Sequence, residues 1–448
     1  MKKAIKLFSL LMALLLTMSL FTGCTESNLD TDEEDLSTLN ITIAVPADKN
    51  SPNWDDWKDL MASWVEDFET FSHIKLKIET VPTDEKGLKQ FKKKVKSGKI
   101  SCFLGTSNET INQLLEDEAL MELSVIEGQY TALMEKIPQG VRYLSLEDDS
   151  TQWMVPIYGT YQAVYCNTEI FEQHQLPLPT TWEELTNAIN VLKAAGVTPI
   201  SAGFADKGLG YMIDELILSE GGTAEHSYQP TFGTVSSWER AASEMKDLEL
   251  AGAFTPDCYN VTFEQAVADF EDGKAAMIVA PSSEMIGHID EDNVAVIGLP
   301  ATAGGKREAG AFVGDVEHGI YISRNGYQKK NARYGVAIVE LLGSDYFGSP
   351  EFYNLVKSEA TFCANPDNYS GEEENNFEES VVDLTDSAAA ADIPMSQSLK
   401  TFDNLADTFR SILKDGMIVK ENEAEMKARL LVAAEAEIEA NTAPAEKE

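Results

Sequence analysis

Cysteine and histidine are scarce in this 448-residue chain, which holds five of each. The histidines show no spacing typical of metal ligands. Past position 24 the cysteines are scattered and form none of the short paired spacings of zinc ribbons or thioredoxin-like redox motifs; these four are Cys102, Cys166, Cys258 and Cys363. The sequence therefore predicts no metal site. We interpret the four cysteines mainly as small buried hydrophobic residues, with two disulfides as the alternative.

Positive charge is scarce as well. Lysine and arginine total 35 against 75 aspartates and glutamates, which gives a net charge of −40. Such a chain repels nucleic acid and anionic lipid surfaces, so nucleic acid is excluded as a partner. The lysine-rich stretch at residues 86–99 is interpreted as the solvated face of a helix, whose apolar side is formed by Leu88, Phe91 and Val95.

Motifs of catalysis are missing too. The chain has no nucleophile elbow, no metal-binding histidine pair and no phosphate-binding loop. It is therefore predicted not to be an enzyme and to carry no cofactor. An exported glycosidase stays open as an alternative, because it needs only two carboxylates facing one cleft and this composition does not exclude them.

The N-terminus has the order of a secretory signal. Three lysines among the first six residues precede a largely apolar run over residues 7–21, and Cys24 follows shortly after it. The run is too short to span a membrane as a helix, which takes ~20 residues. Its end resembles the bacterial lipobox, so residues 1–23 are predicted to be a lipoprotein signal peptide and Cys24 the lipidated N-terminus. An ordinary secretory signal is the alternative. Residues 24–38 are acidic and aperiodic, which predicts a disordered tether on the outer face of the bacterial cell membrane.

Beyond the tether, strand and helix patterns alternate. Residues 40–46 predict a strand, residues 54–71 carry apolar side chains at helical spacing, and residues 73–81 predict a second strand. The lysine-rich helix and an apolar stretch at 100–104 follow. This order predicts an α/β fold with helices on the faces of a sheet. An acidic stretch at 365–380 is interpreted as a solvated loop, with a calcium site as the alternative.

A further helix has clear end signals. Thr180 or Thr181 can cap a helix that begins at Trp182, and Gly196 can end it. The residues after that glycine are typical of a buried strand.

Three sequence blocks carry a family resemblance. They are residues 153–203, with Pro156, a strand ending in Asn167 and the Pro-Thr-Thr-Trp-Glu-Glu helix start; residues 270–283, with Gly-Lys-Ala-Ala-Met; and residues 294–323, with Leu-Pro and a glycine-rich turn. Their order and content resemble the family 1 extracellular solute-binding proteins, the maltose-binding type.

The resemblance implies a two-lobed periplasmic-binding-protein-like fold (type II) that closes around its ligand by a hinge motion. The implied N-terminal lobe is residues 39–160 and 314–365, and the C-terminal lobe is residues 161–313 and 366–448. Also implied are a sugar or oligosaccharide ligand held between the lobes, delivery to an ABC permease whose separate subunits use the ATP, and a monomeric chain. A polyamine-like cationic solute and a surface adhesin stay open as alternatives.

The resemblance also points to ligand-binding residues. Sugars need groups that bind hydroxyls and aromatic plates beneath the ring. The residues carried over by position are Thr106, Ser107, Asn108, Glu109, Tyr158, Thr160, Tyr161, Tyr211, Asp214, Asp315, Glu317 and Phe402. Tyr161 and Tyr211 have the alternative of core aromatics, and Glu109 and Asp315 that of surface acids. Two departures put maltose itself in doubt: Ser101-Cys102 stands where the family has Pro-Asp, and Ser283 stands near its cleft tryptophan.

Overall fold

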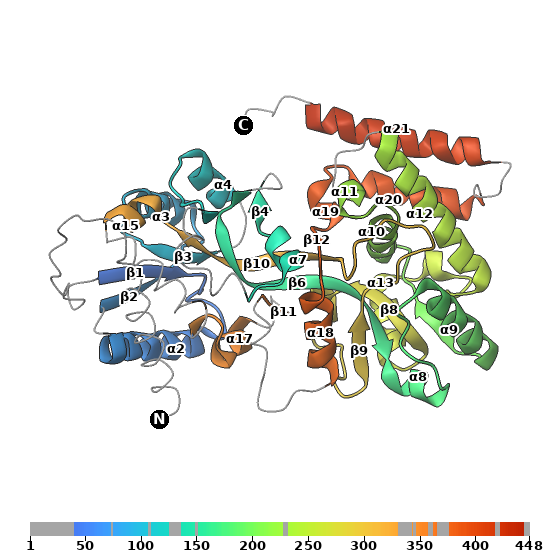
Figure 1. The fold of residues 1–448 in the computed structure, drawn as a ribbon, viewed down its shortest axis with the longest axis horizontal. Coiled ribbons are helices and arrows are strands. Elements are labelled where there is room, and N and C mark those ends of the chain that lie inside the picture. The colour runs from blue at the N-terminus through green and yellow to red at the C-terminus, as the bar shows by residue number, and fades with distance from the viewer. Residues whose placement is uncertain are drawn as a thin grey trace, which may run out of the picture. The chain divides into compact units, whose positions relative to one another are not determined.

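A computed structural model describes the part of the chain treated below. The described residues are 40–72, 75–105, 109–124, 136–147, 151–226, 232–329, 343, 346–356, 362–364, 376–416 and 422–442. They fall into two compact units (Figure 1). Unit 1 takes its described residues from Met1–Val125 and Ile320–Tyr346, and unit 2 from Ile126–Gly319 and Phe347–Glu448. The bounds of these units differ from the lobe boundaries expected from the sequence, and those lobe boundaries stay a prediction.

Unit 1 is built on three parallel strands. β1 lies between β2 and β3, and Ile43 of β1 pairs with residues of both neighbours. The strands are β1 (Asn40–Val45), β2 (Lys75–Thr80) and β3 (Cys102–Gly105). The helices are α2 (Trp54–Asp67), continued by the π-helical η2 (Phe68–Ser72), then α3 (Glu85–Lys96), α4 (Glu109–Glu116) and α15 (Arg324–Lys329). The strands and helices predicted for this part of the chain are thus confirmed.

The lysine-rich helix α3 forms for local reasons. Asp84 caps it by accepting a hydrogen bond from the backbone N–H of Gly87, and three lysines in the last turn suit the negative end of the helix dipole. Phe91 and Val95 are buried. Lys86, Lys89 and Lys93 are exposed, which agrees with the predicted solvated face.

The sheet of unit 2 centres on the long strand β6. β8 and β9 both pair with it antiparallel, and β7 lies parallel to β8. The strands are β6 (Met154–Asn167), β7 (Thr198–Ser201), β8 (Ala275–Pro281), β9 (Val294–Ile297), β10 (Phe312–Ile322), which continues into unit 1, β11 (Phe362–Cys363), β12 (Ala391–Asp392), and the separate pair β4 (Leu146–Glu147) and β5 (Thr151–Gln152).

Helices surround this sheet, and α10 is buried among α11, α12, α20 and β8 (Figure 1). The helices are α7 (Gln139–Tyr143), α8 (Thr168–Gln173), α9 (Trp182–Ala195), α10 (Gly208–Gly221), α11 (Thr223–His226), α12 (Phe232–Ala251), η3 (Cys258–Asn260), α13 (Phe263–Glu271), α14 (Ser282–Met285), α17 (Pro350–Val356), α18 (Asn376–Asp386), α19 (Met395–Ser398), α20 (Phe402–Lys414) and α21 (Glu423–Thr442). Because α18 covers residues 376–380 of the acidic stretch interpreted as a loop, that interpretation was wrong there, while residues 365–375 lie outside the described residues. Apolar Val381 and Leu384 are buried and give the helix a packing face.

The predicted ends of α9 are confirmed. Thr181 and Glu184 form a capping box, in which each side chain accepts a hydrogen bond from the other residue's backbone N–H. Gly196 ends the helix with a φ of 81°, a left-handed conformation that favours glycine.

Two glycines bring β6 and β10 close together. A Cβ on Gly159 would lie 2.1 Å from the backbone oxygen of Asp315, and one on Gly314 would lie 2.7 Å from that of Thr160. No side chain fits at such distances. This close approach places Thr160 and Asp315, two of the predicted ligand residues, on adjacent backbones.

The four described cysteines are free and buried. This supports their interpretation as small hydrophobic residues.

Candidate functional site

The carboxyl ends of the strands of unit 1 open onto a pocket of about 420 Å³. In α/β sheets this is the edge at which ligands bind. The pocket is lined by Pro46, Ala47 and Asp48 after β1, by Val81, Pro82 and Thr83 after β2, by Phe103, Leu104, Gly105, Glu109, Thr110 and Ile111 from β3 and α4, and by Leu88 and Phe91 of α3.

The lining combines carboxylates with an apolar wall. Phe91 and Phe103 pack edge to face, with ring centroids 5.2 Å apart. Asp48 accepts the backbone N–H of Asn50 at 2.9 Å, and Glu109 accepts Nε2 of Gln113 at 2.8 Å. Each of these bonds uses one oxygen of the carboxylate. Both acids are exposed, so their second oxygens can meet a ligand.

Glu109 is the predicted ligand residue that the structure places in this pocket. Thr106, Ser107 and Asn108 lie outside the described residues, as does Cys24. The sequence analysis missed Asp48 and Thr83. Each follows directly after a predicted strand, and that position was the signal that could have found them.

In unit 2, Tyr158 and Tyr161 are buried in aromatic packing. Tyr158 lies against Phe352 and Tyr353, at centroid distances of 5.3 and 5.7 Å, and Tyr161 stacks on Tyr165. Each tyrosine is 1% exposed. These contacts favour the alternative that Tyr161 is a core aromatic, and they place Tyr158 in aromatic packing as well, although only a ligand contact was predicted for it.

Tyr211 has a more open position on α10. Its hydroxyl donates to Oε1 of Glu284 at 3.2 Å, and Nζ of Lys207 lies 2.6 Å from the same oxygen. Its ring packs edge to face on Phe263. Burial and the adjacent Glu284 raise the pKa of Tyr211, so the phenol stays a neutral donor. Phe402 lies beside the same helix, with Cε1 3.0 Å from the position of a Cβ on Gly210.

Lys207 and Glu284 were missed by the sequence analysis. Lys207 follows β7 and Glu284 follows β8, so both belong to the carboxyl ends of parallel strands. Glu284 is next to Ser283, the position where the family resemblance would put a tryptophan. The structure thus has an ion pair beside Tyr211, near the position at which the family has a cleft tryptophan and this chain does not.

Asp315 and Glu317 lie on β10 and are half-buried. Burial raises the pKa of Asp315, and Nε2 of Gln397 opposes this shift by donating to Oδ2 at 3.0 Å. Thr160, on the adjacent backbone of β6, is also half-buried.

Asp214 has a different environment. It is 2% exposed, and its Oδ1 lies 2.7 Å from Nε2 of His226 and accepts the backbone N–H of Met395 at 3.1 Å. Its carboxylate is engaged by the protein, which supports a structural role.

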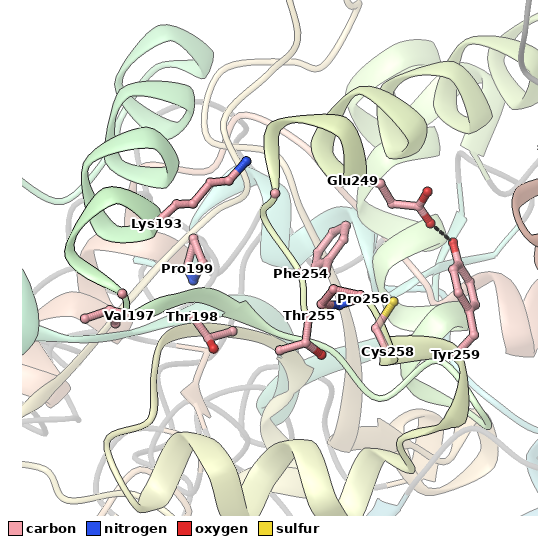
Figure 2. Close-up of a pocket in the computed structure, with 12 residues that line it drawn as sticks. Lys193, Val197, Thr198, Pro199, Glu249, Phe254, Thr255, Pro256, Cys258 and Tyr259 are labelled. Atoms are coloured by element: carbon pink, nitrogen blue, oxygen red, sulfur yellow. Dashed lines mark hydrogen bonds between the residues drawn. The ribbon is translucent and has the colours of Figure 1, made fainter.

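A larger pocket of about 540 Å³ lies on another part of unit 2 (Figure 2). It contains none of the predicted ligand residues. Its polar groups bond within the protein: Glu249 accepts the hydroxyl of Tyr259, and Lys193 donates to the backbone oxygen of Ala251 at 2.7 Å. Because this pocket lies at Thr198, where β7 begins, and not at the carboxyl ends of strands, the unit 1 pocket is the better candidate despite its smaller volume.

Within the described ranges, no three or more His, Cys, Asp or Glu side chains are arranged to hold a metal ion. Nor does any helix there have the length and apolar character needed to cross a membrane.

The α/β units with a pocket at the strand ends are compatible with a protein that binds a small solute, and a comparison with protein families identifies the class. The family profile for bacterial extracellular solute-binding proteins matches residues 54–342. The chain belongs to this family, and its fold is the two-lobed one that the resemblance implied.

Solved structures share the fold at low sequence identity. The solute receptor AcbH, whose structure is described with an exclusive preference for β-D-galactopyranose, is 14% identical with a TM-score of 0.66, over 90% of this chain and 99% of that one. A probable secreted solute-binding lipoprotein from Streptomyces coelicolor is 15% identical, TM-score 0.64, with the same coverage. RafE from Streptococcus pneumoniae is 14% identical, TM-score 0.59, over 92% and 99%. A search among curated proteins gave no match.

Proposed function

We propose that this protein is the extracytoplasmic substrate-binding lipoprotein of an ABC importer, and that it captures a sugar or short oligosaccharide for delivery to the membrane permease. Cys24 is the proposed lipid anchor on the outer face of the cell membrane. The chain acts as a monomer, and separate subunits hydrolyse the ATP. Membership of the solute-binding family supports a binding role rather than a catalytic one.

The main support for a sugar as the ligand is the pocket of unit 1. A sugar presents hydroxyl groups at its edge and apolar C–H groups on its faces. The pocket offers the carboxylates of Asp48 and Glu109 and the hydroxyls of Thr83 and Thr110, beside an apolar wall. Its volume of about 420 Å³ lies in the range of small-molecule sites.

The surface around Tyr211 supports the same ligand class. The phenol, the ammonium of Lys207 and the carboxylate of Glu284 provide both donors and acceptors within one cluster. A sugar hydroxyl both donates and accepts, so such a mixed cluster suits it. The structural neighbours described as sugar receptors point in the same direction.

A thermal-shift screen of the full chain in detergent tests the proposal. The panel contains mono- and oligosaccharides, polyamines and amino acids. A ligand that binds only the folded state raises the melting temperature by an amount set by its concentration relative to Kd. One class of sugars should stabilise the protein with little dependence on salt. Stabilisation by polyamines alone, weakened by salt, would replace the sugar with a cationic solute.

Glu109→Gln tests the pocket itself, with Glu116→Gln as the matched control on the same helix. Removing a charged acceptor of a ligand hydroxyl should raise the Kd of the sugar about tenfold or more. Glu116 is exposed and does not line the pocket, so its variant should bind as the natural chain does. Calorimetric titration measures both, and equal affinities for the two variants would exclude Glu109 from the site.

A further inference from the structure

His226 is held between two carboxylates in the interior of unit 2. It is the last residue of α11 and has no exposed side-chain surface. Its Nε2 lies 2.7 Å from Oδ1 of Asp214 on α10, and its Nδ1 lies 3.2 Å from Oδ2 of Asp392 on β12. Both ring nitrogens therefore face acceptor oxygens at hydrogen-bonding distance.

With both aspartates ionised, this geometry requires a charged ring. A neutral imidazole has one N–H and one lone pair, so either tautomer would point a lone pair at one of the two carboxylates. Only the imidazolium donates to both. Burial alone would lower the pKa of His226, but the hydrogen bonds and charges of the two aspartates outweigh it and raise the pKa to about 10.

Other charged groups on the neighbouring elements have partners of their own. On α10, Glu215 pairs with Arg307 and Glu220 pairs with Arg240 of α12. On α11, Glu225 pairs with Lys306. The two aspartates are thus the charged groups that touch the ring among the described residues of these elements.

The same two aspartates also hold the backbone of one segment, residues 391–398. Asp214 accepts the N–H of Met395 at 3.1 Å, and Asp392 accepts the N–H of Ile393 at 2.9 Å. In addition, β12 pairs with β10 in register, with Asp392 opposite Val313. The charged ring therefore joins this segment to α10 from the inside of the unit.

The segment leads directly to predicted ligand residues. Gln397 donates to Asp315 at 3.0 Å, and Phe402, a few positions further on, lies against α10 at Gly210, beside Tyr211. A shift of the segment would move Gln397 away from Asp315 and Phe402 away from Gly210, the residue before Tyr211.

We propose that His226 is a positioning residue for ligand binding: as an imidazolium between Asp214 and Asp392, it fixes the segment that brings Gln397 to Asp315 and Phe402 to Gly210 of α10. The inference rests on the proposed function, because its effect on binding is measured with the sugar that the screen identifies. It assigns His226 no contact with the ligand.

The first measurement needs no ligand. In ¹⁵N-labelled full chain, the ring nitrogens of His226 should show two N–H groups and imidazolium shifts from pH 6 to 8. A single N–H in this range would overturn the proposal. Because this spectrum does not depend on sugar binding, it decides the protonation of His226 even if every sugar fails to bind and the proposed function falls.

The second measurement is the pH profile of the sugar Kd in Asp392→Asn and in the natural chain. Losing one carboxylate removes a cause that raises the pKa of His226, while burial still lowers it, so the variant ring loses its proton at lower pH. The natural Kd should stay constant from pH 6 to 8, whereas that of the variant should rise about tenfold across this range. A variant Kd without pH dependence would overturn the positioning role.

His226→Gln and His288→Gln complete the test. The glutamine at 226 has its N–H donors at one end of the amide and would turn its carbonyl oxygen toward the second aspartate, so sugar affinity should fall about tenfold at every pH. His288 is exposed and pairs with Glu271, away from the cluster, so its variant should bind normally. If His226→Gln does not fold, the spectrum and the pH profile of Asp392→Asn still test the proposal. Equal affinities of folded His226→Gln and His288→Gln would contradict the proposal.

Discussion

Raising the pH from 6 to 10 should remove a defined part of the stability of unit 2, because the buried ring of His226 is bound there as an imidazolium. Its pKa is about 10 in the folded protein against 6.5 for a free imidazole. A group whose pKa is raised by folding stabilises the folded state fully below its unfolded pKa. That stabilisation is then lost as the pH rises toward the folded pKa. The window for His226 therefore runs from about pH 6.5 to 10.

The size of the effect follows from linkage. At 1.36 kcal/mol per pKa unit, the difference between the two pKa values corresponds to roughly 4–5 kcal/mol at pH 6. The side chain has no exposed surface, so solvent does not screen its two ion pairs. The free energy of unfolding of a domain is only ~5–15 kcal/mol in all, so losing this contribution should remove a large fraction of it.

Urea denaturation at pH 6, 8 and 9.5 measures it, with His226→Gln beside the natural chain. Other groups that titrate in alkaline solution do so in both proteins, so the difference in stability between the two proteins cancels their effect. The natural chain should be more stable by several kcal/mol at pH 6, and this gap should shrink steadily toward pH 9.5. A gap that stays constant from pH 6 to 9.5 would refute the reasoning.

Two further predictions concern the strand β10. His318 is buried, its Nδ1 has no partner among the described atoms, and burial lowers its pKa to about 4. The folded protein should therefore lose stability as the pH falls from 6.5 to 4. His318→Leu should remove this loss of stability in acid, measured as melting temperature against pH, and should raise the free energy of unfolding by about 1 kcal/mol at pH 7. If His318→Leu loses stability in acid as the natural chain does, this prediction is contradicted. Gly159→Ala should cost about 3 kcal/mol or more by urea denaturation, since its Cβ would lie 2.1 Å from the backbone oxygen of Asp315. Gly105→Ala, whose Cβ meets nothing closer than 3.5 Å, is the control, and equal costs for the two variants would argue against the close approach of β6 and β10.

Local patterns predicted much of the fold. The capping box of α9 lies within four residues of chain, and the end at Gly196 needs only a left-handed backbone, so both could be recognised without tertiary contacts. In unit 1, the strands β1 and β2 and the helices α2 and α3 followed from the pattern of apolar residues, whereas α4 and α15 were not predicted. In the acidic stretch at 365–380 the many charges hid the few apolar positions of α18, and the helix was missed.

The site residues depended on contacts that a sequence does not display. Asp214 resembled a ligand carboxylate, but His226 and Met395 engage it, and Met395 lies far away in the chain. Likewise, Lys207 and Glu284 form one ion pair from two distant segments. Tyr158 and Tyr161 fitted an aromatic site by type, and only their burial reveals that they are packed in the core.

The most direct test of the account is a calorimetric titration of the full chain in detergent with the sugar that stabilises it most and with the epimer of that sugar at one hydroxyl group. Because the proposed site recognises hydroxyls through fixed carboxylates, the account predicts saturable binding of the first sugar and at least about tenfold weaker binding of the epimer. Equal binding of both epimers, or no binding of any sugar alongside salt-sensitive binding of a polyamine, would contradict it.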